Sequence, residues 1–457
     1  MDNDEAGLMP ITDDESISEI EEQCLPVNKS VNRNNHNFTY VEHTKTEFVI
    51  FKLTLIFSTL AVVILFPLYL KNVSLAGNVY SLLLTNTVLS AGVFILGSVF
   101  LKLLFFKFEY TGILKLPFSK LKLFKITLIY FSCAAALAYA LDQKRVDCHF
   151  QDPMKALVLL FAFLYYFFVC ERFMCLRRIF STTIIITGLF VALDYSLCNK
   201  FKCRGYEIQH TSDDSGNWSK QTHAVWTSVY IIGLALFAAF FTVLEQILFK
   251  VKKAIPGLCT VSSSVSTMSV SSSVTELEQI NVCKKISSVQ LVMWLHIFGI
   301  LIVGSLFWIE FIPQIGKVGS NAKEVVNNTF NGIHCHFSNE VDCRNTTIIS
   351  WLFLFSYTGF VAASIHFLIL TQSAVYTVAT MSTALPLAAV WWSFVQMVPT
   401  ENDLVIWKPS ITGDLISSLL GLPIVTLGLY FWYKAHMKDC QQFSRISHLS
   451  IRGNLIT

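Results

Sequence analysis

Ten apolar runs constrain this chain more than any other feature of its sequence. A bilayer core of about 30 Å is crossed by roughly 20 residues of α-helix, and a helix is needed because lipid offers no partner for unpaired backbone groups. The runs lie at 47–70, 76–101, 122–142, 154–171, 178–197, 223–249, 288–309, 348–371, 374–397 and 411–434. The sequence therefore predicts an all-α integral membrane protein with ten transmembrane helices.

Composition favours the same class and excludes several others. Of the 457 residues, 53% are hydrophobic and 14% charged, with a mean hydropathy of +0.55, whereas soluble domains are about 25% charged. A net charge of +3 gives no reason to expect a nucleic-acid partner. The twelve cysteines lack the Cys/His spacing of a zinc site. We expect the lipid bilayer as a partner, with no metal and no cofactor.

The basic residues predict the orientation of the chain. With the N-terminus in the cytosol, the cytosolic segments hold 21 Lys and Arg against 12 on the opposite side, and an excess of basic residues marks cytosolic loops. Residues 1–46 are polar and acidic and contain no apolar stretch typical of a cleavable signal peptide. We expect both termini in the cytosol.

Glycosylation triplets and cysteines agree with this orientation. The triplets at Asn217, Asn327 and Asn345 all fall in loops that it places outside the cytosol, where glycans and disulfides form. The same loops hold Cys148, Cys198, Cys203, Cys335 and Cys343. We predict a disulfide between Cys335 and Cys343, leave the pairing of the other three open with Cys148 as the odd thiol, and read the triplets at Asn28 and Asn37 as chance matches.

Ten spans divide into two sets of five, and an odd number per set makes the second set enter the membrane from the opposite side. That is the geometry of an inverted repeat. The alternative is that the two sets are unrelated, because any two apolar helices that follow a charged turn look alike. The expected domains are a disordered acidic tail (1–46), a first half (47–198), a second half (223–435) and a C-terminal tail (436–457). The second half contains a Ser-rich cytosolic linker at 251–286 and a loop outside the cytosol at 310–347.

Three stretches resemble a known family. They are "CERFMCLRRIFSTTIIITGLFVA", "IIGLALFAAFFTVLEQILFK", and "FNGIHC" followed by "LFLFSYTGFVAASIHFLILTQSAVYTVATMSTALPLAAVWWSF". They are similar to the drug/metabolite transporter superfamily, which includes nucleotide-sugar carriers, and within it to the chloroquine-resistance-transporter-like group. Glu171 and Gly188 stand where that superfamily has an acidic residue and a glycine. The resemblance implies a secondary carrier with a central cavity between two halves.

Polar residues within the apolar runs are the candidates for a solute or proton pathway, because they are costly in lipid and tend to face a cavity. They are Asn86, Tyr139, Asp194, Glu245, His296 and His366. The histidines and the carboxylates have structural alternatives. Each His can be a neutral imidazole bonded to a neighbouring helix, Asp194 can be interfacial, and Glu245 can pair with a basic residue.

The leading function is secondary active transport of a small organic solute such as a metabolite, amino acid, peptide, thiol or nucleotide conjugate. Proton coupling or exchange would drive it, because no nucleotide-binding loop is present. The alternative is a polytopic receptor or scaffold that transports nothing, and no motif indicates an enzyme or catalytic residues. "DEAGLM" and "YTGI" approximate sorting signals, so we expect sorting adaptors on the N-terminal tail and an endosomal, lysosomal or vacuolar membrane, with the Golgi and plasma membrane as alternatives. Oligomeric state is left open.

Overall fold

A computed structural model describes residues 45–104, 119–146, 148–170, 174, 176–193, 220–249, 288–312, 315–316, 321–338, 340, 343–397 and 405–453. Within this part of the chain, ten helical segments are long and apolar enough to cross a membrane. Each coincides with one of the ten predicted spans, which confirms a multi-pass, largely α-helical membrane protein. The predicted tail 1–46, except its last two residues, and the linker 251–286 lie outside the described residues.

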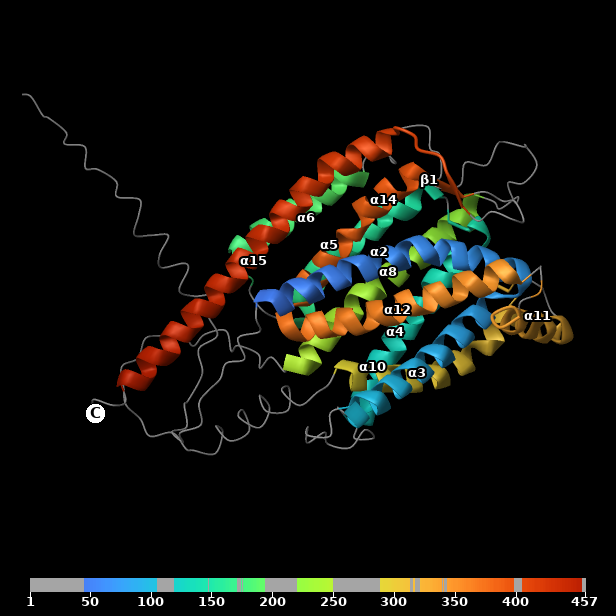
Figure 1. Ribbon diagram of the computed structural model, residues 1–457, viewed down its shortest axis with the longest axis horizontal. Coiled ribbons are helices and arrows are strands. Elements are labelled where there is room, and N and C mark those ends of the chain that lie inside the picture. The colour runs from blue at the N-terminus through green and yellow to red at the C-terminus, as the bar shows by residue number, and fades with distance from the viewer. Residues whose placement is uncertain are drawn as a thin grey trace, which may run out of the picture.

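The spans run roughly along one direction and form an elongated bundle (Figure 1). Seven of them are the single helices α2 (Lys45–Ala76), α3 (Val79–Leu104), α4 (Lys120–Leu141), α5 (Cys148–Cys170), α6 (Leu176–Leu193), α8 (Lys220–Phe249) and α12 (Arg344–Thr371). The other three are α10 (Ser288–Ser305) with the 3-10 turn η2 (Leu306–Phe311), α13 (Ala374–Ser382) with α14 (Ala384–Phe394), and the start of α15 (Gly413–Gly453).

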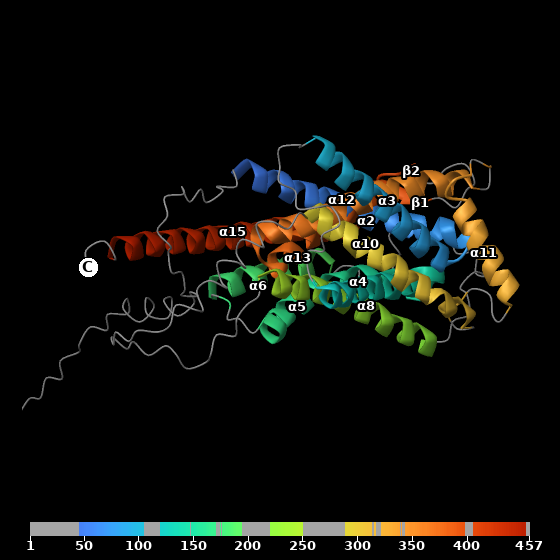
Figure 2. The ribbon, with the colours of Figure 1, turned by 90° about the horizontal axis from the view of Figure 1, so that it is seen from below.

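Helix α11 (Ala322–His334) lies at one end of the bundle, against α2, α3 and η2, and this end is called the α11 end. The N-terminus of α2 and the C-terminus of α15 lie at the opposite end (Figures 1 and 2). There, a two-residue connection turns the chain from α12 into α13. Gln372 adopts a left-handed conformation, and the Ser373 side chain accepts a hydrogen bond from the Tyr376 N–H as the N-cap of α13.

The helices pack mainly in pairs that join the first five spans to the last five. Helix α2 packs against α12, α3 against α10, α4 against α8, and α6 against α15. Helix α5 also packs against α8, and α14 against α2. The core runs through these interfaces, and every residue of α13 is buried.

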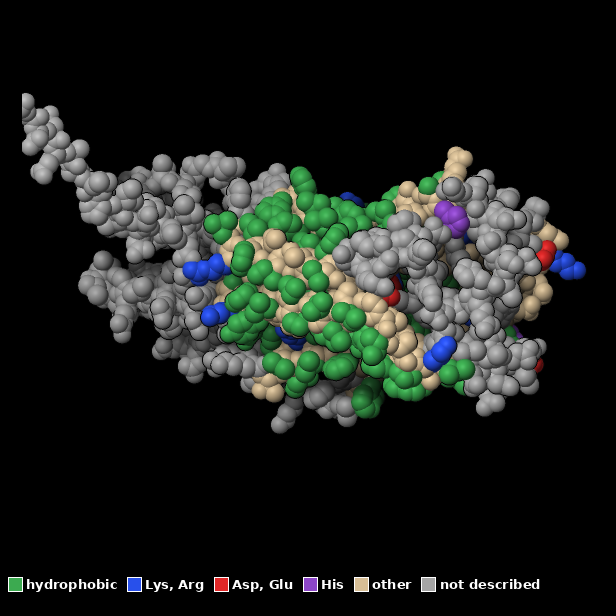
Figure 3. Space-filling model, turned by 90° about the horizontal axis from the view of Figure 1, so that it is seen from above, with side chains coloured by type: hydrophobic (Ala, Val, Ile, Leu, Met, Phe, Trp, Pro, Cys, Tyr) green, Lys and Arg blue, Asp and Glu red, His purple; other side chains and the backbone are tan. Residues whose placement is uncertain are grey.

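The outer surface is apolar, as a lipid-facing surface requires. Large hydrophobic side chains are exposed along the spans, including Phe57, Leu96, Phe168, Phe180 and Leu301, each at least 62% exposed. Figure 3 shows such side chains over the middle of one face. In water a patch of this extent would drive association, whereas in lipid it needs no further partner.

Three local features differ from the sequence prediction. The ninth span is two helices that meet at Thr383, and it ends at Phe394 rather than 397. A short antiparallel hairpin follows, with β1 (Val395–Met397) paired to β2 (Val405–Trp407). Its β-branched and aromatic residues favour strands, so the fold is not purely α-helical.

Glycines allow α6 and α15 to pack closely against each other. A Cβ added to Gly188 would lie 2.8 Å from the backbone N of Val425, and one added to Gly421 would lie 2.6 Å from the backbone N of Ala192. Small residues at such contacts let two backbones pack directly against each other.

We expect Gly188→Val to destabilise the protein by about 1–3 kcal/mol, because the added side chain overpacks this interface. Gly92→Val is the matched control, since a Cβ at Gly92 meets nothing within 4 Å. Thermal unfolding of both purified variants in detergent measures the difference. Equal unfolding midpoints would show that α6 and α15 do not need this close contact.

Candidate functional site

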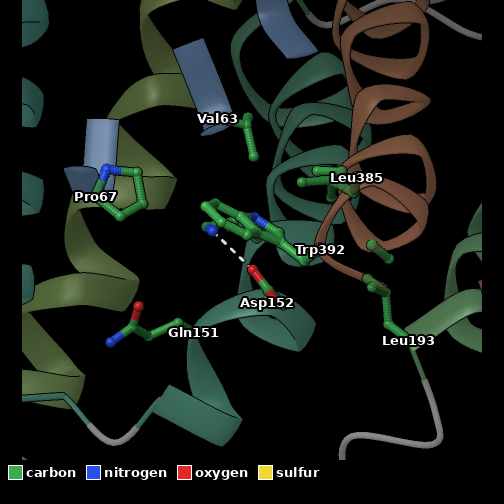
Figure 4. Close-up of a pocket in the computed structure, with 10 residues that line it drawn as sticks. Val63, Pro67, Gln151, Asp152, Leu193, Leu385 and Trp392 are labelled. Atoms are coloured by element: carbon green, nitrogen blue, oxygen red, sulfur yellow. Dashed lines mark hydrogen bonds and ion pairs between the residues drawn. The ribbon is translucent and has the colours of Figure 1, made fainter. Parts of the chain in front are cut away.

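A pocket lies between the first five spans and the ninth. Its cavity volume is about 40 Å³, which is room for roughly three water molecules, and it is partly open to the surroundings. Its walls come from α2, α5, the end of α6, and α14 (Figure 4). The apolar lining residues are Val63, Pro67, Leu193, Leu385, Ala388, Ala389 and Trp392. Small-molecule sites also combine apolar walls with a few polar groups, but they are larger than this cavity.

The polar wall of the pocket is the first part of α5. Lys155 Nζ lies 2.7 Å from Asp152 Oδ1, and the two side chains are 20% and 28% exposed; the dashed line in Figure 4 marks this ion pair. The Gln151 amide donates to the Val146 carbonyl at 3.0 Å. The backbone carbonyl of Gln151 accepts a hydrogen bond from the Tyr230 hydroxyl at 3.2 Å, which ties the start of α5 to α8.

His296 lies in the middle of the bundle, fully buried among aromatic rings. Its Nδ1 is 2.9 Å from the Val292 carbonyl, and its Nε2 is 3.4 Å from the Tyr357 hydroxyl. Tyr357 in turn pairs with Tyr130 at 2.8 Å, and the rings of Phe94 and Phe131 pack on the imidazole. The cluster joins α3, α4, α10 and α12, so His296 contacts both halves of the bundle.

Tyr139 belongs to a buried network at the α11 end. Its hydroxyl donates to Glu310 Oε1 at 2.8 Å, and the same oxygen accepts from the Tyr80 N–H at 3.1 Å. Tyr139 and Glu310 are 4% and 2% exposed. The network therefore links α3, α4 and η2, which come from different halves of the chain.

Arg145 extends this network. It is 1% exposed, and its guanidinium donates to the carbonyls of Tyr139 at 2.9 Å and Ile315 at 2.6 Å. The guanidinium also lies over the Trp226 ring, 4.4 Å from its centroid, and Arg145 Nη2 is 4.0 Å from Asp142 Oδ2. Burial lowers the pKa of the Arg145 guanidinium, and the carboxylates of Asp142 and Glu310 oppose that shift. The Arg145 guanidinium is thus a buried cation that backbone carbonyls from both halves of the bundle hold in place.

Glu245 lies at the opposite end of the bundle and is fully buried. Its Oε2 accepts from the Ala374 N–H at 2.6 Å, at the first residue of α13. A carboxylate at a helix N-terminus also interacts favourably with the helix dipole. Nearby, the Tyr376 ring stacks on Trp432 with centroids 4.1 Å apart. These contacts fix the first half of the ninth span against α8 and α15.

His366 and Asn86 lie elsewhere. His366 is half-buried at the same end as Glu245, with its Nδ1 3.3 Å from Ser288 Oγ and its ring 4.0 Å from that of Phe51. Asn86 is half-buried in α3. The five described pathway candidates, Asn86, Tyr139, Glu245, His296 and His366, therefore lie on different helices, and none of these five lines the pocket.

The loop between the seventh and eighth spans contains a disulfide between Cys335 and Cys343, with Cα atoms 4.8 Å apart. His336, the residue after Cys335, is 1% exposed. Its Nδ1 lies 2.6 Å from the Gly332 carbonyl, and its Nε2 lies 2.6 Å from the Tyr69 hydroxyl. The imidazole thus connects the loop to α2.

Two of the predicted glycosylation triplets are visible in this region. Asn327 is exposed on α11, whereas Asn345 is half-buried in the first turn of α12. The threonines of both triplets have structural contacts. Thr329 Oγ1 accepts from the Asn78 amide at 2.9 Å, and Thr347 Oγ1 donates to the carbonyls of Cys335 and Ser338 at 2.8 and 2.6 Å.

Several predicted features lie outside the described residues. They are Asp194, Asn217, Cys198, Cys203, Glu171, the side chain of Cys148, and both sorting-like motifs.

Sequence reasoning overlooked Asp152 and Lys155 of the pocket and Arg145 of the network. Asp152 and Lys155 stand before the apolar run at 154–171 or at its edge, so they look like loop residues. The available signal was their spacing, because opposite charges three residues apart lie on the same face of a helix. Arg145 gives no local signal, since its partners come from α4, η2 and α8.

Comparison with known proteins yields no protein-family model and no curated protein that matches this chain.

We expect the disulfide loop to loosen at acidic pH. Burial lowers the pKa of His336 below its ordinary value of 6.5. On acidification the imidazole is therefore protonated at a higher pH in the unfolded chain than in the native chain. The stability that neutral His336 contributes is complete above about pH 6.5 and is lost as the pH falls below it. Hydrogen exchange in residues 325–338, corrected for intrinsic rates, should be faster at pH 5 than at pH 7.5.

His336→Gln removes the titrating group and should shrink this pH difference. His334→Gln is the control, because His334 is exposed two residues away. A pH difference that survives His336→Gln would assign the effect to other groups.

Proposed function

We propose that this protein is a secondary transporter of a small organic solute that works by alternating access. In such carriers two structurally related halves rock against each other around a site near their interface. The resemblance to the drug/metabolite transporter superfamily noted above favours the same function.

The observation that carries the proposal is the pattern of helix pairs. An inverted repeat relates span 1 to 6, 2 to 7, 3 to 8, 4 to 9 and 5 to 10. Under this exchange the pair α2–α12 (spans 1 and 8) becomes α8–α4 (spans 6 and 3), and both pairs occur. The pairs α3–α10 and α6–α15 map onto themselves, and α5–α8 maps onto α14–α2. Two related five-helix halves would give this symmetric pattern of pairs, which supports the proposal.

The position of the pocket supports alternating access. It lies between α2, α5 and α6 of the first half and α14 of the second. On the other side of Thr383, α13 is fully buried and held by Glu245 and by the Tyr376–Trp432 stack. The ninth span is therefore packed closely at one end of the bundle and borders a pocket at the other.

We also propose an orientation for the chain and a membrane in which it resides. The distribution of Lys and Arg favours cytosolic termini, which would place the α11 end and the pocket outside the cytosol, in the lumen of an endosome, lysosome or vacuole. Proton coupling would involve groups that both halves contact, of which His296 is the most central. Exchange of two solutes needs no titrating group and is the alternative.

We expect purified protein in liposomes to take up one or a few solutes from a metabolite mixture in a saturable manner. Ala389→Trp should abolish this uptake, because Ala389 lines the pocket and is 1% exposed, so an indole there fills the space. Ala224→Trp, at an exposed position of α8, is the control. Mass spectrometry of the vesicle contents gives the flux, and absence of any saturable flux would favour a receptor or scaffold.

The glycosylation triplets test the orientation. We expect enzymatic deglycosylation to reduce the apparent mass, and the combined change of Asn217, Asn327 and Asn345 to Gln to remove that effect. A glycan traced to Asn28 or Asn37 would invert the topology.

The Asn327 triplet also separates glycan loss from fold loss. Asn327→Gln and Thr329→Ala both remove it, but only Thr329→Ala breaks the bond with Asn78. We expect Thr329→Ala alone to cost about 1 kcal/mol of stability, measured by thermal unfolding after deglycosylation. Equal stability of the two variants would mean that this hydrogen bond contributes nothing measurable.

A further inference from the structure

The β1–β2 hairpin connects the ninth and tenth spans at the same end of the bundle as α11 (Figures 1 and 2). We propose that this hairpin is an interfacial membrane anchor, and that its partner is the phospholipid headgroup region on the α11 side of the bilayer. The inference requires that the protein spans a membrane, and it does not depend on the proposed transport function.

The side chains of β2 are apolar and open to the surroundings. Val405, Ile406 and Trp407 are 42%, 43% and 69% exposed. Successive side chains of a strand point to opposite faces, so both faces of β2 present accessible apolar groups. Ile411, four residues beyond β2, is 88% exposed. A two-stranded hairpin is marginally stable in water and needs a hydrophobic contact to persist, so this surface disfavours a position in bulk water.

The backbone of the hairpin disfavours the hydrocarbon core. In the part of the chain that the structure describes, β1 and β2 form a sheet of two strands, so each strand has one edge without a partner strand. Open edges are not found in lipid-exposed hydrocarbon, because their N–H and C=O groups would lack hydrogen bonds there. The headgroup region supplies both water and apolar contact, so it suits a hairpin with apolar side chains and open edges.

The position of the hairpin along the chain gives the same depth. Strand β1 begins directly after Phe394, the last residue of the ninth span. Three residues of strand extend about 10 Å, and the headgroup region is roughly 5–8 Å thick on each side of the bilayer. Lys408 follows β2 directly and is exposed, so its ammonium can reach lipid phosphates from this depth.

The apolar surface of the hairpin continues into the lipid-facing surface of the bundle. The Trp407 ring stacks on the Phe394 ring, with centroids 5.7 Å apart. Trp391, three residues earlier on α14, is 43% exposed, and Ile416, near the start of α15, is 52% exposed. Tryptophan is enriched at the boundary between lipid and water. The hairpin therefore extends a surface that faces lipid, which favours lipid as its partner.

A second copy of the chain is the other partner that an open strand edge could take. Strands of three residues offer few backbone groups for such pairing. Lys408 and Pro409, both exposed, follow β2 directly. Very short strands, lysine and proline are features by which edge strands avoid pairing with another chain, so these observations favour lipid over a second copy.

Fluorine NMR of the full-length protein in phosphatidylcholine nanodiscs tests the anchor. All nine tryptophans are replaced by 5-fluorotryptophan, and the resonance that disappears in Trp407→Phe belongs to Trp407. Trp407→Tyr gives the same assignment if the first variant fails to fold. We expect a nitroxide on the lipid headgroup to relax the Trp407 resonance at least threefold more than the same content of nitroxide at the end of the acyl chain.

A water-soluble nitroxide completes the depth measurement. We expect it to relax Trp407 at least threefold less than it relaxes free 5-fluorotryptophan in the same solution. Trp432 is the internal control, because it is fully buried in the bundle and should be relaxed less than Trp407 by the headgroup nitroxide.

A variant links the depth of Trp407 to the apolar side chains of the hairpin. Val405→Asp places a charge on β2 and should reduce the effect of the headgroup nitroxide on Trp407 at least twofold. Val326→Asp is the matched control, because Val326 on α11 is 40% exposed and Val405 is 42% exposed. This control should leave the relaxation of Trp407 unchanged.

Three results would overturn the anchor. Relaxation of Trp407 by the water-soluble nitroxide as strong as that of free 5-fluorotryptophan would place the hairpin in water. A dominant effect of the chain-end nitroxide would place it in the hydrocarbon core. Protection from all three nitroxides would mean that another chain, such as a second copy, covers it. None of these measurements needs a solute, so they test the anchor whether or not the protein transports one.

Discussion

The fold depends on the need to satisfy every polar group inside the protein, because the surrounding lipid offers no hydrogen bonds. The backbone meets this need by forming helices, and hydroxyl side chains meet it by bonding to the carbonyl one turn back. Thr59, Thr87, Thr127, Thr242 and Thr371 all do so. The interfaces between spans are consequently filled by apolar side chains and glycines. Ionisable groups persist where another group compensates them, as Asp152 compensates Lys155 and as Tyr139 and Tyr80 bond to Glu310.

The sequence predicted the spans well because the signal for a transmembrane helix is local. Each apolar run coincides with a helical segment, whose ends differ from the predicted ends by a few residues. The break at Thr383 and the β1–β2 hairpin were not predicted. The break depends on a partner distant in sequence, since α13 is held by Glu245 from α8. The hairpin is local, but each of its strands has only three residues. A hydropathy profile contains neither kind of information.

The candidate site was predicted less well, for a related reason. A polar residue in an apolar run attracts notice, so Tyr139, Glu245 and His296 stood out, and each has specific contacts in the structure. Their partners did not stand out. Tyr357 resembles any aromatic residue of a membrane helix, and Arg145 lies in a loop. A pocket forms where spans 1, 4, 5 and 9 meet, and that meeting is set by the pairwise packing of the whole bundle.

The Asp152–Lys155 pair has a further consequence for a carrier. Moving one elementary charge across a membrane potential of 100 mV changes the free energy by about 2.3 kcal/mol. A carrier that returned empty with an isolated carboxylate would feel this voltage at each cycle. Here the two charges are adjacent and on one helix, so they would cross the field together and contribute no net charge. The voltage across the membrane would then do no work on these two groups.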